Sequence, residues 1–591
     1  MRDAAKLGAL PEWDLSDLYA GIDDPVLARD LDAVEADAAA FSQRYKGRIA
    51  GMDGAALGAM LAAYEALEDR LGRIGSFAGL LHAGDMSDAA IGRFYQTVNE
   101  RLTQATAALL FISLELNKLE DEALETKLQA PALAHYRPWV EEQRLMRPHQ
   151  LADDMEQLLH EKHVVGRAAW IRLYDETLAG LRFQAGGESL TLEETLNLLS
   201  DKDEAVRRRA AEALAAGFEA ELRLFALIAN TLAKDKAIED RWRGMPTPAH
   251  GRHLANQVEP EIVAALSEAV RRAYPELSHR YYAMKAKWLG KPKLAYWDRN
   301  APLPEAEDRL IPWDEARETV LGAYGAFAPE MRAIGERFFE KPWIDAPARP
   351  GKAAGAFAHP TVPSAHPYLL LNYLGKTRDV MTLAHELGHG VHQVLAGPQG
   401  ALMAGTPLTL AETASVFGEQ LTFRALLDAE ASPARRRTML ARKVEDMINT
   451  VVRQIAFYEF ELCVHGERAG GELSVERLGE IWMAVQSESL GPAIELAPDY
   501  ASYWCYIPHF VHSPFYVYAY AFGDCLVNSL YAVYQNAESG FQEKYFEMLR
   551  AGGTRRHRQL LAPFGLDAGD PAFWRRGLDV IAGFIDELEG L

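Results

Sequence analysis

His385-Glu386-Leu387-Gly388-His389 is the stretch of this 591-residue chain that decides its fold and its chemistry. Apolar residues on both sides of it recur at helical intervals, which predicts that the motif lies on a helix. Residues four apart lie on one face of a helix, so both imidazoles can reach one ion at about 2.0–2.1 Å. The glutamate projects about 100° further around the helix, beside the water that such an ion activates. The pattern therefore predicts a catalytic zinc site, with Glu386 as its general base.

Two histidines do not complete such a site, which takes three protein ligands and keeps one position open for water. Downstream of the motif, residues 411–419 have the spacing of a second helix, and Glu412 and Glu419 share one of its faces. We predict Glu412 as the third ligand, because segment 397–409 contains glycine and proline residues that allow the chain to turn back. Glu419, two turns along, is in position to orient a ligand histidine through its other ring nitrogen.

The residues after the motif distinguish between classes of zinc site. A metzincin has a glycine three residues after the second histidine and a further histidine three residues later. This chain has His392 and Leu395 at those two positions, which excludes the metzincin pattern. The gluzincin arrangement, two histidines and a glutamate, remains.

The composition is that of a water-soluble globular protein, with 49% hydrophobic and 25% charged residues. A net charge of −22 repels nucleic-acid phosphates and anionic membrane surfaces, so neither is expected as a partner. The three cysteines are too few for a disulfide framework, which favours a reducing compartment. The N-terminal residues carry charges where a secretory signal needs an apolar stretch, and no apolar run reaches the roughly 18 residues of a membrane span. We therefore expect a cytoplasmic protein.

Apolar residues at intervals of three and four predict that most of the chain is helical. Two such stripes are Leu27, Leu31, Val34, Ala38 and Phe41, and Leu214, Phe218, Leu222 and Phe225. Thr191 and Glu194 have the spacing of a capping box that opens the second helical region. The best candidate strands lie at 293–297 and 368–373.

The expected architecture is therefore mainly α, with two helical lobes and a small β-sheet beside the metal-binding helix. We expect an N-terminal helical lobe over residues 1–190 and a catalytic region over 191–591. The glycines and prolines of 340–366 predict a long loop system ahead of the second strand.

A cluster of histidines and tyrosines in the segment 503–520 is the second feature with chemical potential. Peptide hydrolysis builds negative charge on the carbonyl oxygen, and imidazole and phenol groups can donate hydrogen bonds to it. The alternative is structural. Tyr516, Tyr518 and Tyr520 are spaced by two, as on one face of a strand, and composition alone favours this packing role.

Four motifs together carry a resemblance to a known family. They are Leu383-Ala384-His385-Glu386-Leu387-Gly388-His389-Gly390-Val391-His392, Ala411-Glu412-Thr413-Ala414-Ser415, Ile507-Pro508-His509-Phe510 and Phe515-Tyr516-Val517-Tyr518. This set resembles oligoendopeptidase F, a branch of the thimet-oligopeptidase-like zinc metallopeptidases. Residues 13–19 and 367–373 are similar to that family too, so the resemblance spans nearly the whole chain.

The resemblance implies a two-lobed helical fold around a deep internal channel, with one zinc ion per chain. Short peptides are the implied substrates, and the implied reaction is hydrolysis of their internal bonds. His385, His389 and Glu412 match the zinc ligands of the family. Glu386 matches its general base, which accepts a proton from water and then passes it to the departing amine.

The resemblance also implies how the substrate is held. His509 and Tyr516 match the groups that stabilise the transition state. The segment 368–373 matches an edge strand to which a peptide adds its own backbone, with Tyr368 in contact with the substrate.

The tyrosine assignment has open alternatives. Thimet oligopeptidase spaces its tyrosines differently after the corresponding histidine, so His512, Tyr518 or Tyr520 could hold the role given to Tyr516. We expect all three to contact substrate.

A di-iron carboxylate bundle is a rival enzyme class, since its E-x-x-H pattern occurs at 386–389 and again at 276–279. Pro275 predicts a helix start at the second copy, and His385 has no role in that scheme.

A peptide-binding protein without catalytic activity is the rival from another class. Such a binder has no need of a carboxylate beside the metal-activated water, and the intact Glu386 therefore argues against it.

Overall fold

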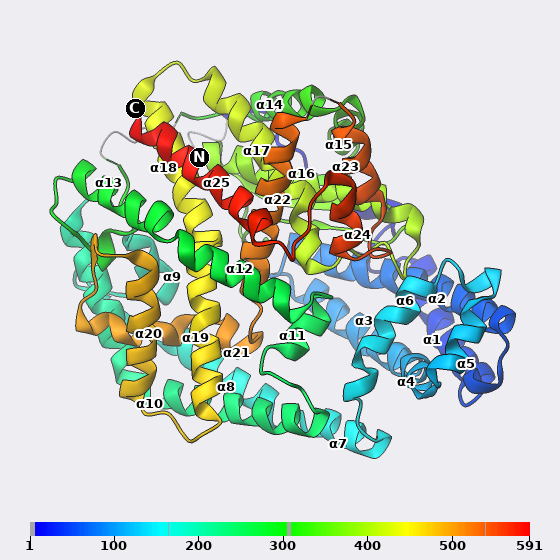
Figure 1. Ribbon diagram of the computed structural model, residues 1–591. Coiled ribbons are helices and arrows are strands. Elements are labelled where there is room, and N and C mark those ends of the chain that lie inside the picture. The colour runs from blue at the N-terminus through cyan, green and yellow to red at the C-terminus, as the bar shows by residue number, and fades with distance from the viewer. Residues whose placement is uncertain (1–5, 164, 304–308, 538) are drawn as a thin grey trace. The chain divides into compact units, whose positions relative to one another are not determined.

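The computed structural model describes residues 6–163, 165–303, 309–537 and 539–591 (Figure 1). The chain is mostly helical with small sheets, which confirms the predicted fold class. In this described part of the chain, no helix combines the length and apolar composition that crossing a membrane requires.

Contacts group the chain into two compact units, and each is described by itself below. Unit 1 consists of residues 1–147, 308–429 and 533–566, and unit 2 of residues 148–307, 430–532 and 567–591. The expected N-terminal lobe ended at residue 190, whereas residues 148–190 group with unit 2. The division of the chain into functional domains at residue 190 stays a prediction.

Unit 1 contains the metal-binding motif. Its helices are α1 (Pro25–Tyr45), α2 (Gly54–Gly84), α3 (Ala89–Ala107), α4 (Phe111–Lys118), α5 (Asp121–Leu128), α6 (Arg137–Gln143), α14 (Trp313–Phe327), α15 (Pro329–Glu340), α16 (Thr377–Ala396), α17 (Leu408–Ala429), α23 (Phe541–Arg550) and α24 (His557–Leu561). Its strands are β4 (Ile344–Pro347), β5 (Phe357–His359) and β6 (Tyr368–Tyr373).

Unit 2 contains the histidine and tyrosine cluster. Its helices are α7 (Asp153–His163), α8 (Arg167–Gly180), α9 (Leu192–Leu198), α10 (Glu204–Arg243), α11 (His250–Ala255), α12 (Pro260–Ala273), α13 (Arg280–Trp288), α18 (Pro433–Thr450), α19 (Val452–Arg468), α20 (Val475–Leu490), α21 (His509–His512), α22 (Tyr518–Asn536), whose last residues group with unit 1, and α25 (Pro571–Glu589). Its short strands are β1 (Phe183–Ala185), β2 (Glu188–Leu190), β3 (Leu294–Ala295) and β7 (Ile494–Glu495).

The two predicted apolar stripes are buried in helices, as their spacing requires. The first stripe is the buried face of α1, which begins at Pro25 after the capping residue Asp24. The second stripe is buried in α10, which ends before Gly244 in the left-handed conformation.

The capping box at Thr191 and Glu194 is confirmed, but it opens a different helix from the one expected. Thr191 caps the short α9, while Asp203 caps α10. In the sequence, the capping box and the apolar stripe of α10 look like parts of one helix, but a turn separates α9 from α10.

The sheet of unit 1 has the order β4-β6-β5, with β6 parallel to β4 and antiparallel to β5. Leu369 of β6 pairs with Ile344 on one side and with Ala358 on the other. The strand predicted at 368–373 is confirmed, but its expected role as an edge strand is wrong, because both of its edges are already paired. The strand predicted at 293–297 is reduced to β3, which pairs with β7 in unit 2.

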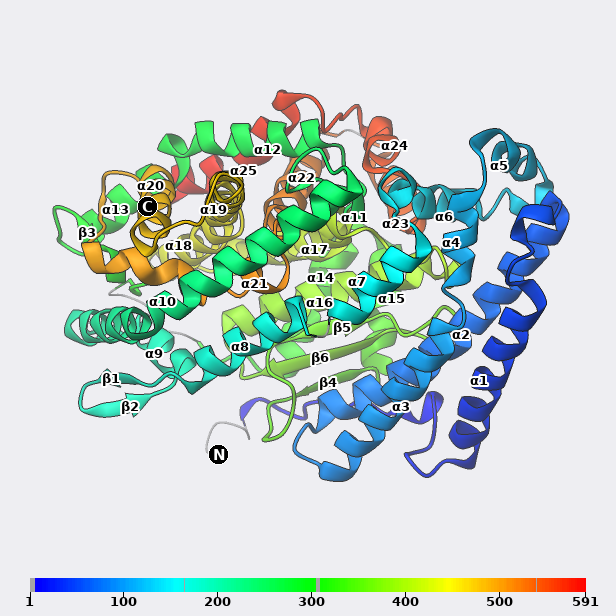
Figure 2. The same cartoon turned by 90° about the horizontal axis from the view of Figure 1, so that it is seen from below.

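The sheet supports the metal-binding helix. Figure 2 shows α16 above β5 and β6, and α16 packs against both strands. The chain turns from β6 into α16 through Asp379, whose carboxylate accepts hydrogen bonds from the backbone N–H groups of Leu374 and Lys376. The negative charge of Asp379 in the first turn also interacts favourably with the positive N-terminal end of the helix dipole.

Candidate metal centre and active site

Two neighbouring helices of unit 1 bring the three predicted metal ligands together. His385 and His389 project from α16, and Glu412 projects from the first turns of α17. Glu412 Oε2 lies 3.4 Å from His385 Nε2 and 3.5 Å from His389 Nε2. One ligand atom from each residue lies within 4.8 Å of the others.

This set of donor atoms fits a zinc ion. Tetrahedral zinc with bonds of about 2.1 Å separates its ligand atoms by roughly 3.4 Å, close to the two distances from Glu412. The three side chains keep 20–27% of their surface exposed, which leaves an open side. Among the residues that the structure describes, no other group of three or more such ligands comes together.

Two further side chains lie next to the predicted ligands. Ser415 Oγ donates a 2.6 Å hydrogen bond to Glu412 Oε2, one turn along α17. Glu419 Oε2 lies 3.9 Å from His385 Nδ1, the ring nitrogen that faces away from Glu412. Burial opposes the charged form of His385, but the nearby carboxylates of Glu419 and Glu412 prevail and raise its pKa to about 9. The site therefore attracts positive charge.

Glu386, the predicted general base, lies on the same helix as the two histidines. It lies between the two histidines in sequence, and its side chain is buried. A hydrogen bond from the backbone of Ala358 on β5 reaches its carboxyl group. Burial raises the pKa of Glu386 to about 7, with the charge of His385 acting in the opposite direction. Glu386 thus lies next to strand β5.

The predicted donors lie in unit 2, on the short α21 and just before α22. His509 Nε2 lies 3.3 Å from the Tyr520 hydroxyl, and the rings of His509 and Tyr516 stack with centroids 5.9 Å apart. The ring centroids of Tyr516 and Tyr520 are 5.4 Å apart. Burial lowers the pKa of His509, which favours the neutral imidazole. Three of the predicted residues therefore form one cluster.

Tyr518 differs from its two neighbours. It is fully buried, and its hydroxyl lies 3.1 Å from His253 Nδ1 and 2.9 Å from Asn256 Nδ2. Because α22 begins at this residue, Tyr516 and Tyr520 lie on one side of the chain and Tyr518 on another, so the strand alternative is wrong. Tyr518 packs in the core of unit 2, where a substrate cannot reach it.

His512 and Tyr368 also have partners within the protein. His512 Nε2 lies 2.7 Å from Asp175 Oδ1 at the surface of unit 2. Tyr368 is fully buried, and its hydroxyl donates to the backbone oxygen of Asp14. The side chain of Tyr368 therefore belongs to the core, which contradicts its expected contact with substrate.

Sequence reasoning missed the strand that does lie beside the site. β5 forms the outer edge of its sheet, and its middle residue Ala358 reaches Glu386. The prediction of a loop over 340–366 covered this strand. The three residues of β5 are too few to show the alternation typical of a strand.

The rival di-iron site finds no support. Glu276 and His279 lie in unit 2, where Glu276 pairs with Arg575 and His279 Nε2 contacts the backbone oxygen of Glu488. No metal-ligand group forms around them in the described part of the chain.

Comparison with known proteins agrees with this geometry. Residues 326–580 match the model of Peptidase family M3, and residues 115–183 match the model of Oligopeptidase F. Oligopeptidase PepF of Bacillus subtilis is 25% identical, over 100% of this chain and 88% of its own. Group B oligopeptidase PepB of Streptococcus agalactiae is 26% identical, over 89% of this chain and 88% of its own.

A solved structure supports the fold. The crystal structure of oligoendopeptidase-F from Enterococcus faecium superposes with a TM-score of 0.70 at 22% identity, covering 95% of this chain and 97% of that one. A helical scaffold with this triad of ligands defines a metallopeptidase. The chain carries a domain of peptidase family M3 over residues 326–580 and an Oligopeptidase F domain over 115–183, and it is similar to oligoendopeptidase F proteins.

Proposed function

We propose that this protein is a zinc-dependent endopeptidase of the cytoplasm that hydrolyses internal bonds of short peptides. The observation that carries the proposal is the convergence of His385, His389 and Glu412 beside the buried Glu386. Three ligands with one open side and an adjacent carboxylate are what metal-assisted hydrolysis needs.

Glu386 moves the proton in the proposed reaction. It accepts a proton from the attacking water and passes it to the departing amine, so one carboxylate acts as base and then as acid. A zinc ion held by the three ligands supplies Lewis-acid activation of the water and of the scissile carbonyl. Ser415 and Glu419 keep the ligands oriented during this cycle.

His509 and Tyr516 are the proposed donors to the oxyanion. Their motif match to the family supports this role, as does their position in one cluster with Tyr520. A neutral imidazole and a phenol donate hydrogen bonds without carrying a counter-charge into the site. Tyr520 remains the alternative donor, since its hydroxyl lies near His509.

The substrate backbone is proposed to pair with β5 rather than with β6. β5 is paired with β6 on one side only, and Ala358 lies next to Glu386. An extended peptide added to this edge would place its scissile bond near the general base. Pairing through main-chain hydrogen bonds recognises an extended backbone rather than particular side chains, so peptides of many sequences could bind.

Peptides with both ends blocked test the proposal. Zinc-loaded protein is incubated with acetylated and amidated peptides of graded length and with a folded protein, and the products are identified by mass spectrometry. We expect internal cleavage of the short blocked peptides and none of the folded protein. An absence of cleavage in every blocked peptide, with one zinc ion bound per chain, would refute the endopeptidase and favour a peptide binder.

A further inference from the structure

The segment between α21 and α22 contains a strained residue. Phe515 has a φ of 60° and its side chain is fully buried. A bulky residue in the left-handed region is strained and persists only where the surroundings hold it. Tyr516, the proposed oxyanion donor, follows directly in the chain.

Glu461 on α19 holds this residue. Its Oε1 accepts a 2.7 Å hydrogen bond from the backbone N–H of Phe515, and only 2% of the residue is exposed. The other carboxyl oxygen has no hydrogen-bond partner among the described residues. The charges of Arg252 and Lys236 also act on this carboxyl group. Burying a carboxyl group with a single hydrogen bond is nevertheless costly, so its retention calls for a reason.

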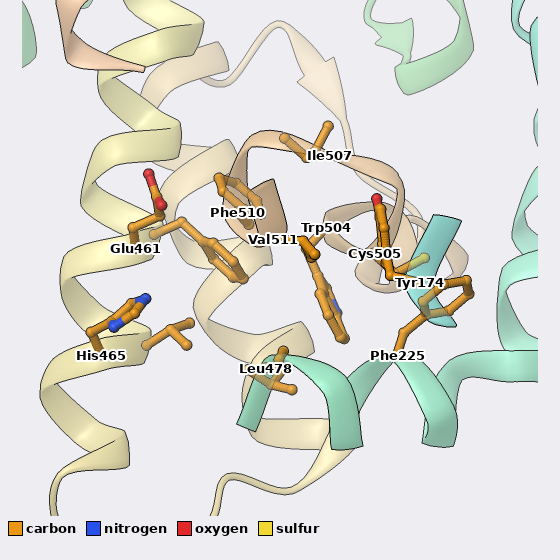
Figure 3. A pocket seen from close by; sticks show the side chains of 13 residues that line it. Tyr174, Phe225, Glu461, His465, Leu478, Trp504, Cys505, Ile507, Phe510 and Val511 are labelled. Atoms are coloured by element: carbon orange, nitrogen blue, oxygen red, sulfur yellow. The ribbon is translucent and has the colours of Figure 1, made fainter. Parts of the chain in front are cut away.

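The same face of α19 packs against the Phe515 ring. The ring of His465, one turn along, lies tilted against the Phe515 ring with centroids 4.8 Å apart, and Tyr458 contacts Phe515 edge-on with centroids 6.1 Å apart. Figure 3 shows that Glu461 and His465 project from the same helix. Both residues line a small cavity of about 30 Å³. The Phe515 ring therefore packs against two aromatic side chains of α19.

Two arginines of unit 2 hold other parts of the segment. Arg167 donates a 2.7 Å hydrogen bond to the backbone oxygen of Val511. Arg252 donates to the backbone oxygen of Pro514 at 3.4 Å and lies 5.5 Å from the centre of the Tyr516 ring. Both arginines therefore bind carbonyl oxygens that precede Phe515, whereas Glu461 binds the N–H group of the strained residue itself.

We propose that Glu461 is a positioning residue, whose buried carboxyl group fixes Phe515 in its left-handed conformation and thereby sets the direction of Tyr516. This inference rests on the proposed role of Tyr516 as an oxyanion donor. The proposed role explains a buried acceptor that no part of the metal site uses. A shift of about 1 Å in a donor can cost about a hundredfold in rate.

Three variants test the role of Glu461. Glu461→Gln keeps the acceptor oxygen, and Glu461→Leu keeps the approximate size but removes it. We expect kcat within about threefold of the wild type for the first variant and a fall of about 30- to 100-fold for the second, with KM changed less than about threefold and one zinc ion still bound. Glu461→Asp retracts the acceptor and decides the test if the leucine variant does not fold, with a fall of about tenfold expected.

A double-mutant cycle separates this role from a general effect on folding. Because Glu461 acts through Tyr516, Glu461→Leu combined with Tyr516→Phe should be no slower than Tyr516→Phe alone, within about threefold. Losses that multiply, or a Glu461→Leu or Glu461→Asp protein with wild-type kcat, would overturn the inference. Wild-type kcat in Tyr516→Phe would instead refute the proposed donor.

Discussion

Gly388 lies against the backbone of Ser415, where a Cβ atom at position 388 would stand only 2.7 Å from Ser415 Cα. The same atom would stand 2.5 Å from the backbone oxygen of Ala414. No real side chain tolerates either distance, so α16 and α17 touch because the residue before His389 is a glycine. This contact brings Glu412, on the turn before Ser415, within reach of the two histidines. The glycine inside the metal-binding motif is therefore part of the metal-binding geometry.

Replacing Gly388 by alanine should push α17 away from α16. We expect zinc affinity to fall at least tenfold and the free energy of unfolding to fall by about 1–3 kcal/mol, the usual cost of overpacking. Competition with a zinc-binding dye measures the affinity. Gly397→Ala, where a Cβ atom meets nothing within 4 Å, is the matched control and should leave both quantities unchanged. Equal zinc affinities in the two variants would contradict this explanation.

Ser415→Ala should weaken zinc binding through its effect on Glu412. The lost hydrogen bond to Glu412 Oε2 leaves the ligand carboxylate free to rotate. Groups that orient metal ligands typically contribute a factor of about 10–100 in affinity, and we expect about tenfold here. The same dye competition measures it, with circular dichroism to check the fold. An unchanged zinc affinity would show that Ser415 does not orient the ligand.

Tyr516→Phe should lower kcat and keep the stability of the protein, whereas Tyr518→Phe should lower the stability and keep kcat. Loss of one oxyanion donor costs about 10²–10³ in kcat, and Tyr516→Phe should show that loss with little change in stability. Tyr518 instead bonds to His253 and Asn256 in the core. Its phenylalanine variant should lose about 1 kcal/mol of stability and keep its kcat. Steady-state kinetics and urea unfolding on the same samples check both, and a large fall in kcat for Tyr518→Phe would contradict the assignment.

Acidification should destabilise the protein through His253. Burial lowers the pKa of this imidazole to about 4, below its ordinary value of about 6.5. Between these values the unfolded chain binds a proton that the folded chain excludes, so stability is lost as the pH falls. Linkage gives about 2 kcal/mol between pH 7 and pH 5. In urea unfolding at both pH values, His253→Gln should lose less stability than the wild type by about that amount. Identical losses would mean that His253 is protonated in the folded protein.

Local patterns were sufficient to predict the parts of the protein that are themselves local. The apolar stripe of α1, the helix that carries His385 and His389 and the helix that carries Glu412 follow from residue spacing alone. The prediction that Glu412 lies beside the two histidines required only the chemistry of zinc and a turn between two helices.

Features that depend on distant parts of the chain were not predictable in this way. The sequence of 368–373 specifies a buried strand, but only the pairing with β4 and β5 shows that it lies in the middle of its sheet. Tyr518 and Tyr516 are of the same residue type, and burial beside His253 alone separates the first from the second. Glu461 gives no signal in the sequence, since its importance arises from Phe515, which lies far along the chain.

The most direct test of the account is the kcat of zinc-loaded Glu386→Gln on an internally quenched peptide, measured beside the wild type. The glutamine keeps the size of Glu386 and leaves all three ligands in place, but it cannot accept a proton. We predict one zinc ion per chain in both proteins and a fall in kcat of at least about a thousandfold in the variant. Turnover close to the wild-type value in a variant that carries its full zinc would contradict the central claim that Glu386 is the general base.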